Sequence, residues 1–447
     1  MDRSLRLIDQ LHNSWNRQHH GHRTGRVSSE VDSALSLHGA PHNFFLWPGH
    51  GAIPGLAKMK LRYLQFIAKK AQFGLHSTML ITLDTLRRFA VARSLFRPTS
   101  LKRSLQKFGF VQADPILAPA RAQDLILRHR VKDYHAGDLE RRYEDLSIEE
   151  DFFLNYGFVT RPVQALMHPR SNTGVPAGGR EPWPEERKRQ AQLLLEFILE
   201  RGAAHPREVD DHFSHGSVRN YWGGSSNATT HLLSALHYRG LLRVARRESG
   251  IRIYTAHEHG PEPSSDAESQ VRLDALVDVA VQVYAPVTGA CLSYLVRRLR
   301  LAVPQWQSEL RDALHRARER LGHARIEGVD WYWPAEENPA RSEPEEMVRL
   351  LAPFDPVVWD RDRFELLWGW AYRFEAYTPA PKRKLGYYAM PLLWRDRIIG
   401  WGNLAVKNGK LKAEFGYVKS QPPRSRTFTR ELEVELNRLE EFLGLNP

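Results

Sequence analysis

The chain has 447 residues, and its 64 Lys and Arg side chains against 52 Asp and Glu give a formal charge of +12. This length corresponds to a few folded units of roughly 100–200 residues each, and 42% hydrophobic residues exclude a wholly disordered protein. No stretch approaches the ~18 apolar residues of a membrane span, and the N-terminus lacks the apolar core of a signal peptide. Cys291 is the single cysteine, which excludes internal disulfides and Cys-rich zinc modules. We therefore expect a cytoplasmic protein.

The positive charge is compatible with a nucleic-acid partner, because phosphates attract basic residues whatever the base sequence. The 12 Trp, 15 Tyr and 19 Phe residues fit the same interpretation. Many basic proteins bind no polyanion, so the charge alone leaves both possibilities open.

Residues 1–78 differ from the rest of the chain. They hold 8 of the 20 histidines and 10 Lys and Arg against 4 Asp and Glu, without sustained apolar periodicity. We expect a basic extension of low order, and its run His19–His22 lacks the Cys or carboxylate pattern of a metal site. Regular structure is predicted only after Met79, and one hypothesis is that Met79 is the natural start of the protein.

A first winged-helix-like unit is predicted at 79–182. Thr82 is placed to cap a helix through residue 96, and a second helix is expected at 100–107. The segment Phe110–Gln112 that follows can extend as a short strand.

A second unit at 183–259 opens with three helix signals. Pro184 is placed in the first turn of one helix, and a short helix is expected at 206–213. Either Ser225 or Ser226 can cap the third helix.

Two stretches that favour β structure, 241–245 and 251–255, complete this unit as a hairpin. Three helices and a hairpin are typical of a winged helix, whose third helix enters a DNA groove while the hairpin contacts the backbone. A solvated charged face or a protein-binding winged helix would show the same order. The hairpin residues predicted to contact DNA are Arg243, Arg246, Arg247 and Arg252.

The remaining chain is predicted to contain a linker at 260–270, a third winged helix at 271–335 and a β-rich domain at 345–447. The fold class is therefore predicted as α+β, with tandem winged helices ahead of a β-rich domain. The elements expected in the last domain are strands at 385–393, 397–406 and 410–417, a turn at Asn408-Gly409, and a closing helix at 427–443.

Gln112 and Asp114 are the residues with the clearest potential for chemistry. Asp114 precedes a proline and is biased towards an extended conformation, so two residues of spacing would direct both side chains to one side. A carboxylate can stabilise an oxocarbenium-like sugar or take a proton from water, and an amide can orient that water. An Asp before Pro is more often a turn residue, so the spacing alone is a weak indication.

Four segments together resemble a known protein family. They are Phe110–Asp114, Ala120–Asp124, Leu351–Asp360 and Tyr377–Tyr388. In these segments the chain resembles the winged-helix DNA glycosylases of the AlkZ/YcaQ type, which unhook interstrand crosslinks. The resemblance covers roughly residues 79–420.

This resemblance implies tandem winged helices and a β-rich domain around double-stranded DNA, and removal of N7-alkylated guanine to leave an abasic site. It implies that Asp114 is the main catalytic group and that Gln112 positions water or sugar. The stretch Lys382-Arg383-Lys384, in an expected hairpin, would contact DNA. Many relatives have a histidine where this chain has Tyr156, so a role borrowed from that histidine does not carry over.

An N7-alkylated guanine is cationic and leaves easily, so one carboxylate could suffice without metal or cofactor. We therefore expect a DNA repair glycosylase with neither, acting as a monomer at the nucleoid. The alternative is a non-enzymatic winged-helix transcriptional regulator, since winged helices are most often regulators. A protein-binding scaffold explains the basic charge least well.

Overall fold

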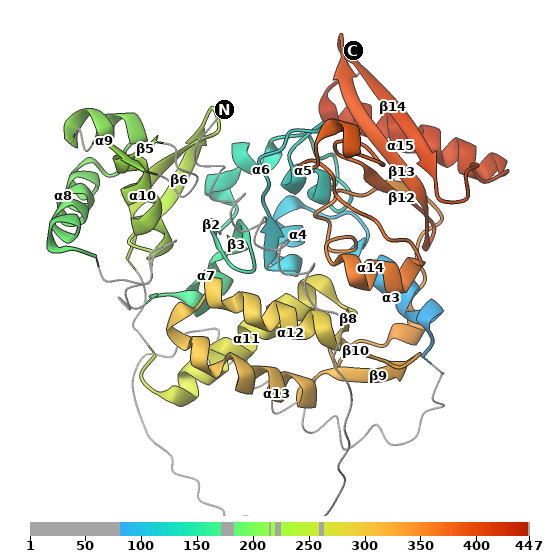
Figure 1. Ribbon diagram of the computed structural model, residues 1–447, viewed down its shortest axis with the longest axis horizontal. Coiled ribbons are helices and arrows are strands. Elements are labelled where there is room, and N and C mark those ends of the chain that lie inside the picture. The colour runs from blue at the N-terminus through green and yellow to red at the C-terminus, as the bar shows by residue number, and fades with distance from the viewer. Residues whose placement is uncertain (1–80, 171–182, 214–215, 220–224, 259–262, 446–447) are drawn as a thin grey trace, which may run out of the picture. The chain divides into compact units, whose positions relative to one another are not determined.

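The structure is a computed structural model that describes residues 81–170, 183–213, 216–219, 225–258 and 263–445 (Figure 1). The extension 1–78, with its histidine run, and Met79 lie outside these residues. Helices and antiparallel strands are mixed along the described chain, so the α+β class is confirmed. Among the helices described, none is long and apolar enough to span a bilayer.

The first described part, 81–170, packs helices around a three-stranded antiparallel sheet of order β1-β3-β2. The hydroxyl of Thr82 accepts the backbone N–H of Thr85, so the predicted cap opens the first helix. The elements are α3 (Leu83–Ser94), α4 (Leu101–Phe108), β1 (Phe110–Gln112), α5 (Ala122–Leu127), α6 (Asp138–Arg141), a 3-10 turn (Tyr143–Asp145), β2 (Ile148–Phe152), β3 (Tyr156–Thr160) and α7 (Arg161–Met167).

The second part, 183–258, has a hydrophobic core of its own, and Figure 1 shows α8, α9 and α10 gathered with its strands. The third helix begins at Ala228 and not directly after Ser225 or Ser226, because both lie in a short strand that pairs with 217–219. The elements are α8 (Glu185–Arg201), α9 (Pro206–Phe213), β4 (Ser217–Arg219), β5 (Ser225–Asn227), α10 (Ala228–Tyr238), β6 (Leu242–Glu248) and β7 (Ile251–Ala256).

The third part begins earlier than the sequence indicated. The hydroxyl of Ser265 accepts the backbone N–H of Glu268, so the first helix starts at Asp266, inside the segment predicted as a linker. Its sheet has the order β8-β10-β9. The elements are α11 (Asp266–Tyr284), β8 (Val287–Thr288), α12 (Gly289–Arg298), two 3-10 segments (Leu299–Leu301 and Pro304–Glu309), α13 (Leu310–Arg320), β9 (Gly322–Ile326) and β10 (Val329–Trp333).

The C-terminal part is built on a four-stranded antiparallel sheet of order β11-β12-β13-β14. Asn408 and Gly409 both have positive φ, as a two-residue hairpin turn requires, so the predicted turn is confirmed. The elements are a 3-10 turn (Pro339–Arg341), β11 (Val348–Leu350), α14 (Arg361–Trp368), a 3-10 turn (Ala380–Lys382), β12 (Met390–Trp394), β13 (Arg397–Lys407), β14 (Lys410–Tyr417) and α15 (Arg426–Leu443).

Two expectations for this part are corrected. The strand predicted at 385–393 begins only at Met390, because the backbone N–H groups of Lys384, Leu385 and Gly386 bond to a side chain instead of a neighbouring strand. The basic stretch 382–384 therefore lies in a 3-10 turn and the loop after it, and not in a hairpin.

A buried ion pair joins the first part to the C-terminal part. The Nη atoms of Arg130 donate to both carboxylate oxygens of Asp355 at 2.7 and 3.0 Å, and both side chains are fully buried. The first, third and C-terminal parts contribute to one hydrophobic core, whose buried residues run from Leu86 to Phe442. Loss of Asp355, in the middle of the long motif at 351–360, would leave the buried charge of Arg130 uncompensated, so its role here is structural.

Candidate active site

Gln112 is the last residue of the edge strand β1, and Asp114 lies two residues beyond it. Gln112 pairs with Gly157 of β3, and the N–H of Ala113 donates to the carbonyl of Tyr156 at 3.0 Å. The side chain of Asp114 accepts the backbone N–H of Ile116 at 3.0 Å. Gln112 is 6% and Asp114 4% exposed. The two predicted residues are thus buried and held by a well-bonded backbone.

Gly157 lets β3 approach this strand closely. A Cβ atom at residue 157 would lie 2.3 Å from the carbonyl oxygen of Val111 and 3.0 Å from the Cα atom of Gln112. Both contacts involve backbone atoms, which cannot rotate away. Any side chain at this position would therefore push the strand that carries Gln112 out of place.

Asn155, which the sequence reasoning did not select, contacts Gln112 directly. Its Nδ2 group donates to Oε1 of Gln112 at 3.0 Å. Arg298 of α12 donates from Nη2 to Oδ1 of Asn155 and from Nε to the carbonyl of Leu154 at 2.8 Å. No local signal marks Asn155, because it lies opposite Gln112 only through the pairing of β1 with β3.

Tyr388 brings the C-terminal motif to the same site. Its pKa is raised well above the usual range, first by burial and next by the negative charge of Asp114. The hydroxyl therefore stays protonated and can donate a hydrogen bond. It is buried, and within the described part of the chain it has no hydrogen-bond partner. Two of the segments that carry the family resemblance thus meet at Asp114.

Tyr156 faces a separate cluster. Its hydroxyl donates to the carboxylate of Glu150, and the guanidinium of Arg252 lies 4.4 Å from the centre of its ring. Burial raises the pKa of this tyrosine well above its usual range. In this structure the side chain of Tyr156 thus belongs to an ion-pair cluster with Glu150 and Arg252.

Three of the four arginines predicted to contact DNA from the β6–β7 hairpin form ion pairs with strand β2. The pairs are Arg243 with Glu149 at 3.1 Å, Arg247 with Glu150 at 2.6 Å and Arg252 with Glu150 at 3.4 Å. Both carboxylates are 1% exposed as residues. Arg246 differs, because its partner Glu248 is exposed on the same strand.

The pKa values of the two neighbouring glutamates of β2 are shifted in opposite directions. Burial alone would raise the pKa of Glu150, but Arg247 and Arg252, with hydrogen bonds from Arg247 and Tyr156, lower it to about 2. For Glu149 burial is the largest influence, and its pKa is raised despite Arg243 and Arg161. Glu150 is therefore the more firmly ionised partner of the hairpin.

Lys382, Arg383 and Lys384 lie in a loop whose backbone is fixed by one buried carboxylate. Oε2 of Glu375 accepts the N–H groups of Lys384 at 2.8 Å and of the next two residues at 2.7 and 3.3 Å. Arg383 donates from Nε to the carbonyl of Thr378 at 2.8 Å. None of the three basic side chains is ion-paired with an acidic residue of the described chain, and both lysines are exposed.

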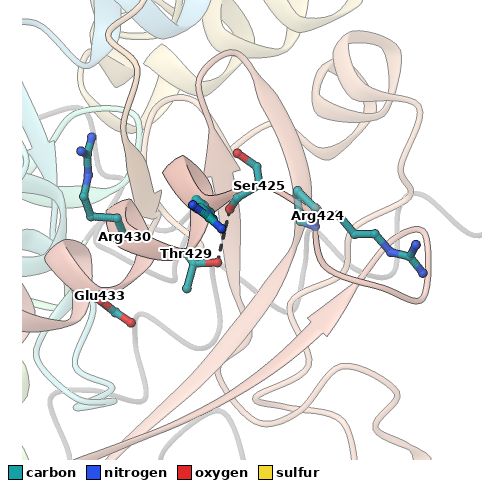
Figure 2. A pocket seen from close by; sticks show the side chains of 7 residues that line it. Arg424, Ser425, Thr429, Arg430 and Glu433 are labelled. Atoms are coloured by element: carbon teal, nitrogen blue, oxygen red, sulfur yellow. Dashed lines mark hydrogen bonds between the residues drawn. The ribbon is translucent and has the colours of Figure 1, made fainter.

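A hollow at the start of α15 is lined by none of the residues discussed above. Figure 2 shows Arg424 and Arg430 directed away from each other, so their charges do not converge on one ligand. The lining residues are Pro423, Arg424, Ser425, Arg426, Thr429, Arg430 and Glu433. Among the residues that the structure describes, no group of three or more His, Cys, Asp or Glu side chains could hold a metal ion.

Comparisons with known proteins identify the family. A family model described as DNA glycosylase AlkZ-like matches residues 105–442. The chain is also similar to the Streptomyces sahachiroi DNA glycosylase AlkZ, with a TM-score of 0.54 and 16% identity over 82% of this chain and 98% of that one. The structural likeness shows a shared fold, and the family match spans most of the chain. The chain therefore belongs to the AlkZ-like DNA glycosylase family and is a DNA repair glycosylase.

Proposed function

We propose that this glycosylase hydrolyses the N-glycosidic bond of N7-alkylated guanine in double-stranded DNA, including interstrand crosslinks, and leaves an abasic site. The observation that carries the proposal is the burial of Gln112 and Asp114, two residues apart in the chain, with Tyr388 close enough for the Asp114 charge to raise its pKa. A cationic guanine is a good leaving group and needs little acid assistance. A site whose main charged group is one carboxylate suits that substrate.

In the proposed reaction, Asp114 takes a proton from water while the water oxygen bonds to C1′ of the deoxyribose. The bond from C1′ to N9 breaks, and its electron pair passes to the guanine ring, which cancels the positive charge caused by N7 alkylation. The carboxylate also stabilises the positive charge that develops on the sugar. Gln112 orients the attacking water.

We propose that the second and third parts of the chain are winged helices that bind the duplex. In the third part, β8 pairs with β10 of a hairpin that follows three helices, which is the order of a winged helix. The ion pairs of Arg243, Arg247 and Arg252 favour a structural role for them. Lys382, Arg383, Lys384 and Arg246 remain the candidates for phosphate contacts.

The function can be tested with a duplex that contains one N7-methylguanine, under single-turnover conditions, with abasic sites detected by alkaline cleavage. Asp114→Asn keeps an oxygen to accept the N–H of Ile116 but removes the charge, so we expect about 10²–10⁴-fold slower excision with DNA binding retained. Asp133→Asn, at an exposed turn position outside the two parts proposed as winged helices, is the matched control.

A nitrogen-mustard crosslink in the same sequence tests the second part of the proposal, because unhooking separates the strands on a denaturing gel. Wild-type protein that leaves N7-methylguanine in place, or an Asp114→Asn variant that excises at the wild-type rate, would overturn the assignment. Specific duplex binding without any excision would favour the regulator instead.

A further inference from the structure

Three polar side chains form a chain of hydrogen bonds that ends at the proposed active site. Arg298 donates to Oδ1 of Asn155, and Nδ2 of Asn155 donates to Oε1 of Gln112 at 3.0 Å. Arg298 and Gln112 are buried, and Asn155 is half-buried. Arg298 is anchored independently by its bond to the carbonyl of Leu154. We call these three residues the amide relay.

The relay has a defined direction, because a guanidinium can only donate hydrogen bonds. The oxygen of the Asn155 carboxamide must therefore face Arg298, which turns its NH2 group towards Gln112. That NH2 group needs an acceptor, so Oε1 of Gln112 faces Asn155 and Nε2 is directed elsewhere. The side-chain hydrogen bond of Gln112 is made at Oε1, in agreement with this orientation.

We propose that Arg298 and Asn155 are positioning residues that make Gln112 a hydrogen-bond donor towards the attacking water. This inference rests on the proposed function. A water that accepts a bond from Nε2 of Gln112 can donate its proton to the carboxylate of Asp114, and its remaining lone pair is left to attack C1′. The opposite amide orientation would offer the water a second acceptor and give its proton two competing destinations.

Two substitutions of Asn155 separate this role from a simple stabilising role. Asn155→Asp has nearly the same shape and still accepts from Arg298, but it has no donor for Gln112. The Gln112 amide would then reverse, with Nε2 turned towards the new carboxylate and Oε1 towards the water. Asn155→Ala removes the constraint and leaves both amide orientations available. The relay therefore predicts more damage from Asp than from Ala, whereas a packing role predicts more damage from Ala.

The experiment measures single-turnover excision of N7-methylguanine by wild type, Asn155→Ala, Asn155→Asp, Gln112→Ala and the double variant Gln112→Ala with Asn155→Asp. We expect excision to slow by less than about 10-fold for Asn155→Ala and by about 10²-fold for Asn155→Asp, because the latter misplaces a preorganised donor. In the Gln112→Ala background, Asn155→Asp should have no further effect, since Asn155 acts through Gln112.

Asn338→Asp is the matched control, because Oδ1 of this exposed residue accepts the N–H of Ala340 and a carboxylate can do the same. Its excision rate should equal the wild-type rate. Melting temperatures of all variants report on folding. A wild type that fails to excise contradicts the proposed function itself. With an active wild type, an Asn155→Asp variant at least as fast as Asn155→Ala, or additive rate losses in the double variant, would overturn the relay.

Discussion

Two groups of basic residues, similar in sequence, are used differently in this structure. The β6–β7 hairpin carries Arg243, Arg247 and Arg252, and all three are paired with buried carboxylates of β2. The loop at 382–384 carries three basic side chains without such partners, on a backbone held by Glu375. In the hairpin, Glu149 and Glu150 neutralise the arginine side chains. In the loop, Glu375 binds backbone N–H groups and leaves the charges of the basic side chains available.

The difference shows that basic residues in a DNA-binding protein can be assigned only when their acidic partners are known. The partner of Arg247 lies 97 residues earlier in the chain, so no local pattern reveals it. The partner of the 382–384 loop is the local residue Glu375, but its bonds are to backbone N–H groups, which cost the loop no side-chain charge.

The largest expected effect distinguishes two neighbouring arginines of the hairpin. The side chain of Arg247 is 15% exposed and pairs with the fully buried side chain of Glu150. The side chain of Arg246 is 46% exposed and pairs with Glu248 at the surface. Arg247→Ala would leave Glu150 partly uncompensated, so the free energy of unfolding should fall by about 3–5 kcal/mol. Arg246→Ala should change it by no more than about 0.5–1 kcal/mol.

Urea denaturation of the two variants at neutral pH measures this difference. Equal losses for Arg246→Ala and Arg247→Ala would show that the ion pair with Glu150 contributes no more than a surface contact, and the contrast between the hairpin and the 382–384 loop would then fail.

The next effect concerns acid stability, through the neighbouring glutamates of β2. The pKa of Glu150 is about 2 in the folded protein, against an ordinary value of 4.5. Its ion pairs therefore contribute fully above pH 4.5, and this contribution is lost as the pH falls from 4.5 through about 2. Glu149 has a raised pKa, so its ionisation acts in the opposite sense, with stability lost as the pH rises through its titration.

Unfolding free energies measured from pH 6 to pH 3 should decline less steeply in Glu150→Gln than in wild type, since the substitution removes one linked proton. Glu149→Gln is the paired control and should not flatten the curve. A curve that is flattened by Glu149→Gln and unchanged by Glu150→Gln would contradict the assignment of Glu150 as the firmly ionised partner.

Local patterns in the sequence predicted most of the elements, and the misses lie where hydrogen bonds to other nearby residues overrode local propensity. The helix Pro206–Phe213 and the hairpin turn at Asn408-Gly409 follow from periodicity and turn chemistry, and both are confirmed. The strand expected from Leu385 failed because β propensity cannot foresee that Glu375 takes the backbone N–H groups. The helix start expected at Ser225 or Ser226 failed because this segment pairs as a strand with 217–219.

The sequence likewise predicted part of the candidate site. Gln112 and Asp114 were selected by residue type and resemblance, and Gln112 ends a short strand that the sequence indicated. Asn155 and Tyr388 were missed as members of the site because their contribution depends on tertiary contacts. Asn155 is opposite Gln112 only through the pairing of β1 with β3. Tyr388 is near Asp114 only through the packing of the C-terminal part.

The smallest expected effect concerns DNA binding, and it compares Lys384, which has no acidic partner, with Arg243, which is paired with Glu149. Lys384→Ala leaves the backbone bond to Glu375 in place, because that bond uses the N–H group and not the side chain. We expect unchanged stability and modestly weaker binding to any duplex. The slope of log affinity against log salt should become shallower by about 0.9, the value for one lost phosphate contact.

Arg243→Ala is the comparison, because its guanidinium is paired with Glu149 and should contribute little to the salt dependence. The salt slope of this variant should match that of the wild type even though its stability is lower. Fluorescence anisotropy with an undamaged duplex between 50 and 200 mM salt, roughly the range in which counterion release is resolved, measures both slopes. If the slope becomes shallower for Arg243→Ala and not for Lys384→Ala, the hairpin binds DNA, and its ion pairs with β2 must open when it does so.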